Sequence, residues 1–155
     1  MKQSETWLVH DHSLYEGLLA RCQEAVEMED WRNANQTFRE MVTQMMRHMA
    51  IEDEVLYPAY EANTDAPQGP TAALREEHRR ILRLVRDMER LLQTNVSEHV
   101  LDSLSELEWQ MLKHHEKEED IFLPMASHIL YEKREEILKK LNEFDASKAA
   151  GKYDD

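Results

Sequence analysis

The chain has little of what several fold classes need. It contains one cysteine, three glycines and four prolines in 155 residues. A lone cysteine cannot form a disulfide within the chain, so nothing indicates an oxidising compartment. Few glycines and prolines leave long stretches without helix breakers. The β-branched and aromatic clusters typical of strands are also missing, and the frequent Leu, Glu, Arg, Met and Ala are helix formers, so an all-α domain is expected.

Positive charge and long apolar runs are scarce as well. The formal net charge is −13, whereas nucleic acids and anionic membrane surfaces bind proteins through basic patches. No apolar run approaches the roughly 20 residues that span a bilayer. The first residues lack the apolar core and the cleavage site of a secretory signal. We therefore expect a cytoplasmic protein that binds neither nucleic acid nor a membrane.

Polar breaks divide the chain into four long segments. We expect a first helix from about Ser4 to a turn at 28–31, a second over 31–61, a third over 70–93 and a fourth over 97–124. Pro70 suits the first turn of the third helix, and Ser97 is a candidate N-cap of the fourth. A shorter amphipathic helix is expected at Ile129–Phe144, packed across one end. One domain over 1–144 and a disordered tail over 145–155 are predicted.

The most informative pattern is an internal repeat with an offset of 66 residues. Two stripes with steps of three and four residues run along the first two helices, and each recurs in the second half of the chain. The first stripe is Leu8, His12, Tyr15, Leu19, Cys22 and Val26, which recurs as Leu74, His78, Ile81, Val85, Met88 and Leu92. The second is Phe38, Met41, Met45, His48, Glu52 and Val55, which recurs as Leu104, Leu107, Met111, His114, Glu118 and Ile121. Because stripes of this spacing face a core, we predict two helical hairpins packed as a pseudo-twofold four-helix bundle.

Polar residues interrupt these otherwise apolar stripes, and their types indicate a metal site. They are His12, His48, Glu52, His78, His114 and Glu118. A buried carboxylate without a partner is costly or becomes protonated, whereas a metal ion compensates its charge. If both glutamates bridge, each of two ions receives two imidazole nitrogens and two carboxylate oxygens. An oxo or hydroxo bridge would add one donor and leave a position open on each ion. This donor set suits iron, manganese or zinc.

The other candidate residues have simpler interpretations. His10, His99 and His128 lie off the stripes and are expected at the surface. His115 is a candidate for an extra ligand to one ion. Tyr15 is expected in the core, with a hydrogen bond to a ligand as the alternative. The acidic runs EEHRR and EKREE are expected on solvated helix faces.

These residues together resemble the hemerythrin-like (HHE cation-binding) domain family. The resemblance covers roughly residues 4–130 and rests on His12, on His48 to Glu52 leading to LYP, on His78, and on His114 to Glu118 leading to FLP. It implies an up-down-up-down bundle with a carboxylate-bridged di-iron centre. Oxygen-carrying members have a second histidine in the third helix and a final aspartate, whereas here Leu74 and Leu82 flank His78 at four residues, and Glu118 ends the motif. The symmetric ligand set is closer to the di-iron domain of iron–sulfur cluster repair proteins.

The leading hypothesis is a protein with two iron ions that binds oxygen or nitric oxide, for sensing, scavenging or iron handling, with an electron donor as a partner. Three alternatives stay open. One is a redox enzyme of the peroxidase or nitric oxide reductase type, or an iron–sulfur centre repair protein. Another is a sensory module that a partner recognises. The last is a metal-free structural bundle. The sequence leaves open whether the protein is an enzyme.

Overall fold

The computed structural model describes residues 2–65 and 69–151, and within them it is helical without strands. The elements are α1 (Lys2–Glu27), α2 (Trp31–Ile51), η1 (Glu52–Leu56), α3 (Tyr57–Glu61), α4 (Pro70–Leu92), α5 (Ser97–Lys117), η2 (Glu118–Phe122), α6 (Leu123–Glu132) and α7 (Arg134–Gly151). The predicted all-α class is confirmed. Within the described ranges, no helix combines the length and hydrophobicity needed to cross a membrane.

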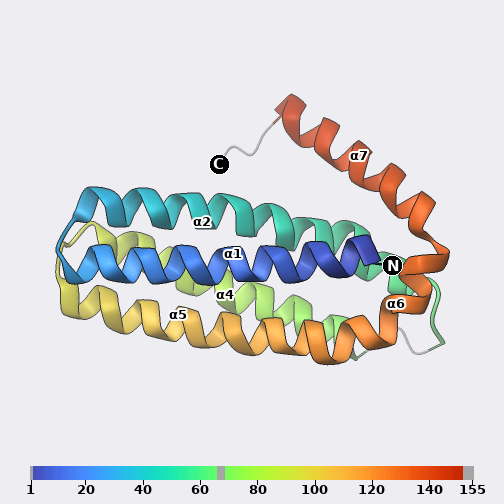
Figure 1. The fold of residues 1–155 in the computed structure, drawn as a ribbon, viewed down its shortest axis with the longest axis horizontal. Coiled ribbons are helices and arrows are strands. Elements are labelled where there is room, and N and C mark those ends of the chain that lie inside the picture. Colours follow the sequence, from blue (N-terminus) through green and yellow to red (C-terminus); the bar gives the residue numbers. More distant parts are fainter. Residues whose placement is uncertain (1, 66–68, 152–155) are drawn as a thin grey trace.

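Four long helices run side by side as two hairpins, α1 with α2 and α4 with α5 (Figure 1). Successive helices run in opposite directions, which is the expected up-down-up-down order. The turns correspond as well: Glu29 and Asn95, 66 residues apart, both have left-handed backbones, with φ of 55° and 57°. The repeat in the sequence is therefore also a repeat in the fold.

The ends of the helices follow local capping chemistry. The side chain of Asp30 accepts a hydrogen bond from the backbone N–H of Asn33 and so caps α2. Gly69 precedes Pro70 with a φ of 111°, which side chains disfavour. The predicted cap at Ser97 is wrong, because Ser97 is the first helical residue and Val96 occupies the cap position without a side-chain hydrogen bond.

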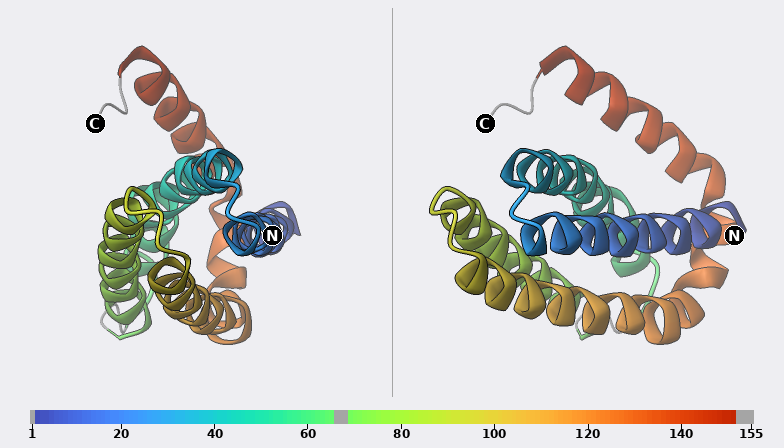
Figure 2. Two further views of the ribbon diagram at one scale, coloured as in Figure 1. Left: turned by 90° about the vertical axis from the view of Figure 1, so that its left-hand side faces the viewer. Right: turned by 60° about the vertical axis from the view of Figure 1, so that its left-hand side comes forward.

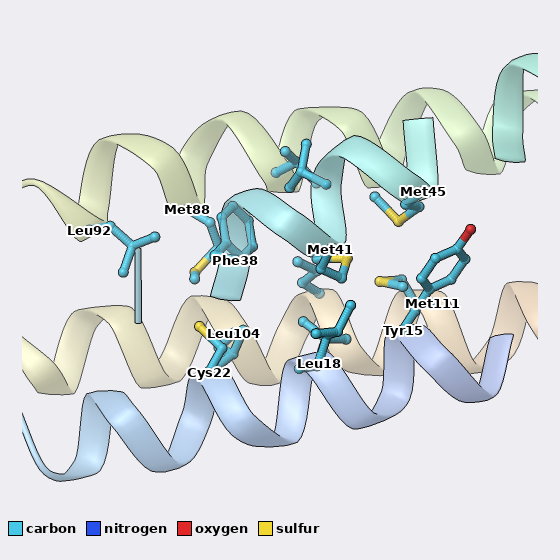
Figure 3. Close-up of a cluster of buried hydrophobic side chains, with 14 of the residues drawn as sticks. Tyr15, Leu18, Cys22, Phe38, Met41, Met45, Met88, Leu92, Leu104 and Met111 are labelled. Carbon is cyan, nitrogen blue, oxygen red and sulfur yellow. The ribbon is translucent and has the colours of Figure 1, made fainter. Parts of the chain in front are cut away.

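The stripes predicted from the sequence form the interior of the bundle. Phe38, Met41 and Met88 lie between the four helices (Figure 3), and Cys22 is fully buried beside them. A second apolar cluster fills the other end, around Tyr57, Phe122 and residues of α6 and α7.

A widened π-helical turn follows the second helix of each hairpin, η1 after α2 and η2 after α5. In η1 the N–H of Tyr57 bonds the carbonyl of Glu52, and in η2 the N–H of Leu123 bonds that of Glu118. Each turn ends two residues before a proline, Pro58 after η1 and Pro124 after η2. A proline ring clashes with the carbonyl four residues earlier in a regular α-helix, and a widened turn relieves that clash.

The extra residue in each π turn shifts the side chains that follow it. Ile121 was predicted to face the core, but it is 51% exposed, and Phe122 takes the inner position at 1%. Val55, the repeat equivalent of Ile121, is buried, because Ile137 and Phe144 of α7 pack against η1. Ile121 instead lines a small cavity with Pro70 and Ala73 at the start of α4.

The C-terminal helices begin and end elsewhere than predicted. The fourth helix continues through Pro124 to Glu132 without ending, and the break lies at Lys133. From there α7 diverges from the four long helices (Figures 1 and 2). It extends to Gly151, into the segment predicted as a disordered tail, while residues 152–155 lie outside the described residues. Arg47 of α2 forms a salt bridge of 2.8 Å with Asp145. The tail and the domain limits stay predictions.

Replacing Leu107 by Ala tests the packing of the four-helix interior. Leu107 is fully buried in α5, and truncating such a side chain costs about 2–5 kcal/mol of unfolding free energy. Urea unfolding, followed by circular dichroism, measures this loss. Leu138→Ala is the matched control, because Leu138 is 44% exposed on α7 and its truncation should change stability little. Equal effects of both substitutions would contradict the assigned core.

Candidate metal centre

The structure brings the six predicted polar residues together inside the bundle. They come from every long helix and both π turns: His12 on α1, His48 on α2, Glu52 in η1, His78 on α4, His114 on α5 and Glu118 in η2. Each of the six is at most 3% exposed. The two glutamates are each the first residue of a π turn.

The Nε2 atoms of the histidines approach the two carboxylates. His12 Nε2 lies 3.0 Å from Glu118 Oε1, and His114 Nε2 lies 3.6 Å from the same oxygen. His48 Nε2 lies 3.3 Å from Glu52 Oε2. On the other side of Glu52, His78 Nε2 lies 3.1 Å from Oε1. The donor atoms thus point toward one common volume.

Two overlapping groups of these atoms have the spacing of metal ligands. One group is His12, His48, Glu52 and Glu118, and the other is Glu52, His78, His114 and Glu118. Within each group the donor atoms lie within 4.8 Å of one another. Bonds of roughly 2.0–2.2 Å to one ion would place opposite donors about 4.4 Å apart, so each group could close on an ion. Both groups share the two glutamates.

An outer ring of carboxylates holds the four imidazoles by their other nitrogen. The Nδ1 to oxygen distances are 2.7 Å from His12 to Glu119, 2.9 Å from His48 to Asp11, 3.0 Å from His78 to Asp53 and 2.8 Å from His114 to Glu77. Ionised carboxylates only accept hydrogen bonds, so each Nδ1 donates. In a neutral imidazole this leaves the lone pair on Nε2, facing the centre, as in carboxylate–histidine–metal arrangements.

The outer carboxylates were missed by the sequence prediction, although the repeat contains them. Asp11 and Glu77 precede the first histidine of each half, and Asp53 and Glu119 follow Glu52 and Glu118, all at the offset of 66. Glu77 belongs to the run EEHRR, which was expected to be solvated. It is instead buried, and it accepts hydrogen bonds from His114 and from Lys117. Pairing carboxylates as well as histidines under the offset would have identified the ring.

Two tyrosines lie at the centre and differ in their contacts. The hydroxyl of Tyr57 donates a hydrogen bond of 2.6 Å to Glu118 Oε2. The hydroxyl of Tyr15 instead donates to the backbone carbonyl of Gln44 at 3.1 Å, while its ring packs edge-on against His48. Tyr15 is therefore a core residue, as expected.

His115 is buried beside the centre but belongs to neither group of donors. Its ring stacks on His12, with centroids 3.7 Å apart and planes 10° apart. It also lines a cavity of about 350 Å³ between α1 and α5, together with Trp109 and Leu112. His10 and His128 are exposed, as is His99. The six residues of the repeat thus converge with His115 beside them, whereas His10, His99 and His128 lie apart at the surface. The role of His115 as an extra ligand stays a prediction.

The electrostatics of the centre favour charged pairs in the metal-free chain. Burial opposes ionisation of Glu52, but the charge on His48 and contacts with Glu118 and His78 bring its pKa well below the usual value. Burial also opposes protonation of His48 and His78, yet the neighbouring carboxylates raise the pKa of each to about 10. For His115, burial and the proximity of His12 lower the pKa to about 2. The carboxylates around His48 and His78 thus favour positive charge at the centre.

Several buried donor atoms at the centre make no well-formed hydrogen bond. They include His12 Nε2, both carboxylate oxygens of Glu52, and Glu118 Oε1. Buried polar atoms are almost always satisfied in folded proteins, and leaving one unsatisfied costs about 1–3 kcal/mol. Because these atoms are the inward ones of both groups, the donor set fits metal ions held between the hairpins.

The stability of the metal-free protein should fall as the pH rises above neutrality. His48 and His78 have pKa values near 10 in the fold, compared with an ordinary value of 6.5. The folded state therefore binds more protons between these values, and its stability decreases as pH rises through that range. Urea unfolding with a chelator present, at a series of pH values, measures this decrease. His48→Gln should flatten it, whereas His128→Gln, at an exposed position, should leave it unchanged.

Comparison with known families agrees with this geometry. The family described as hemerythrin HHE cation binding domain matches residues 4–126, and it matches a second time over 70–154. The two matches begin 66 residues apart, which is the offset of the internal repeat. Neither the curated proteins nor the solved structures gave a match. The family match spans most of the chain, and the chain belongs to the hemerythrin HHE cation-binding domain family.

Proposed function

We propose that this protein holds two iron ions at the centre and binds oxygen or nitric oxide there. The observation that carries the proposal is the pair of overlapping donor groups, each with two histidines and the two shared glutamates. Iron bound in such a nitrogen and oxygen donor set would supply open coordination positions and a ferrous–ferric redox couple. The family assignment supports cation binding, and the choice of iron and of ligand is our inference.

The outer carboxylates would prepare the histidines for metal binding. Each one fixes the tautomer and the ring orientation of an imidazole through its Nδ1. Asp11 and Glu77 act within their own hairpins, on His48 and His114. Glu119 and Asp53 act across the hairpins, on His12 and His78. A site held in this way loses little free energy to reorganisation when an ion enters.

The burial of the centre supports a small ligand rather than a bulky substrate. All six residues of the centre are almost completely covered. Met45 and Met111 lie one turn away on α2 and α5, in the apolar interior, so the surroundings offer few hydrogen-bond partners to a large polar molecule. A neutral diatomic molecule fits such surroundings, because it needs little space and has little hydration to lose.

The metal content of the purified protein tests the proposal directly. About two irons per chain are expected from the two donor groups, by elemental analysis of protein prepared without chelator or affinity-tag metal. Glu52→Ala removes a donor from both groups and should lower the content below one iron per chain. Glu89→Ala, at an exposed position on α4, should leave it unchanged. Stoichiometric zinc would keep the site but contradict redox chemistry.

Ligand binding and turnover separate the proposed function from the redox-enzyme alternative. Anaerobic titration of the ferrous protein with nitric oxide or oxygen should change its visible absorption in proportion to the iron content. Continued consumption of nitric oxide or peroxide under a reductant would indicate an enzyme. Iron that shows no spectral response to either gas would contradict the proposed ligand while leaving the metal centre intact.

Removing an outer carboxylate should weaken metal binding while every direct ligand stays in place. Asp11→Ala deletes the acceptor that holds His48, and the loss of such a partner typically lowers metal affinity about 10–100-fold. Competition with a chromophoric chelator measures the affinity. Asp102→Ala, which changes an exposed aspartate of α5, is the control. Unchanged affinity in Asp11→Ala would show that the ring does not orient the ligands.

A further inference from the structure

The two halves of the centre differ at one buried residue, Tyr57. The repeat places Leu123 at the equivalent position of the second half. Tyr57 is fully buried in the second apolar cluster, and its hydroxyl donates to Glu118 Oε2 at 2.6 Å. Leu123 has no hydroxyl with which to make the corresponding bond to Glu52. The pseudo-twofold symmetry of the bundle is therefore broken at the carboxylates.

The two glutamates consequently offer different numbers of available oxygens. Glu52 directs one oxygen to each half, Oε1 to His78 at 3.1 Å and Oε2 to His48 at 3.3 Å. In Glu118, Oε1 is the oxygen that contacts His12 and His114, and Oε2 is engaged by the hydroxyl of Tyr57. The hydrogen bonding shows the same difference. Both carboxylate oxygens of Glu52 lack a well-formed hydrogen bond, whereas in Glu118 this holds for Oε1 alone.

The available oxygen of Glu118 lies closer to one half than to the other. It is 3.0 Å from His12 Nε2 and 3.6 Å from His114 Nε2. The position between His12 and His48 thus has two imidazoles and a near oxygen from each glutamate. The position between His78 and His114 has two imidazoles and one oxygen of Glu52, while Oε1 of Glu118 lies farther from it than from the other position. One position is better supplied with protein donors than the other.

The surroundings of Tyr57 hold its ring, and with it the hydroxyl, in place. Its ring packs nearly parallel to that of His78, with centroids 5.7 Å apart, and edge-on against Phe122. The guanidinium of Arg75 lies 5.4 Å from the ring. This packing keeps the hydroxyl directed at Oε2 of Glu118, 2.6 Å away.

We propose that the Tyr57 hydroxyl makes the two ion positions unequal by withholding one oxygen of Glu118. The position between His12 and His48 then binds its ion more tightly and fills first. The position between His78 and His114 fills second and is the more open to a small ligand. Tyr57 acts here through Glu118 and is a positioning residue. This inference rests on the proposed function, because it requires two ions at the centre.

Stepwise loading with metal tests the inference without any measurement of activity. The metal-free protein is titrated anaerobically with Co²⁺, whose visible absorption reports its ligands, and in parallel with Fe²⁺. The native protein should load in two steps that differ by about tenfold or more, the size of effect expected for a partner that tunes a ligand. His12→Ala should remove the tighter step, and His78→Ala the weaker one.

Tyr57→Phe removes only the hydroxyl and should bring the two steps together, because Glu118 can then offer one oxygen to each position. Tyr60→Phe is the matched control, since Tyr60 is buried in the same apolar cluster as Tyr57 and packs against Phe122 rather than against a residue of the centre. It should keep two separate steps. Should Tyr57→Phe fail to fold, Tyr57→Leu installs the residue that the second half already has, and circular dichroism confirms its fold.

The outcomes distinguish this inference from the proposed function. Two separate steps in both the native protein and Tyr57→Phe would overturn the role of Tyr57 and leave the dinuclear site standing. Equal steps in the native protein would overturn it as well. Failure of the native protein to bind any of these ions would overturn both proposals.

Discussion

The burial of two carboxylates, Glu52 and Glu118, is the constraint on which the rest of the structure depends. Neither is exposed at all, and the free energy of removing a carboxylate from water is large unless positive charge or hydrogen bonds compensate it. Four imidazoles surround the pair, and four further carboxylates hold those imidazoles from outside. The polar layer therefore alternates carboxylates with imidazoles, with acids at its centre and at its edge.

This layer also organises the packing of the bundle. The long interior, with Phe38, Met41 and Met88, lies on one side of it, and the cluster around Tyr57 and Phe122 lies on the other. Each π turn begins at a glutamate of the layer. The irregular backbone and the buried acids thus coincide, as is frequent where a π turn serves a functional site.

The repeat predicted most of the fold and the residues that converge, because histidines and glutamates on an apolar stripe are costly to bury unless they bind an ion or one another. The prediction failed where a contact depends on how the helices pack, which residue spacing along one helix does not show. Glu77 and Asp53 lie beside the stripes, and on a helical projection they cannot be distinguished from solvated acids. Ile121 was assigned to the core because its spacing assumed a regular helix, and the π turn shifted the register by one residue. The continuation of the fourth helix to Glu132 was missed because Pro124 was taken as its end, whereas the widened turn tolerates that proline.

The hydrogen bonds between the halves have a mechanical consequence. His12 of the first hairpin is held by Glu119 of the second, and His78 of the second by Asp53 of the first. These two crossed bonds brace the hairpins against sliding along each other, because a shift of one helical turn would break both at once. Neither hairpin can orient its own full set of histidines alone. The smallest unit able to assemble the centre is therefore a pair of hairpins, whether joined in one chain, as here, or contributed by two chains.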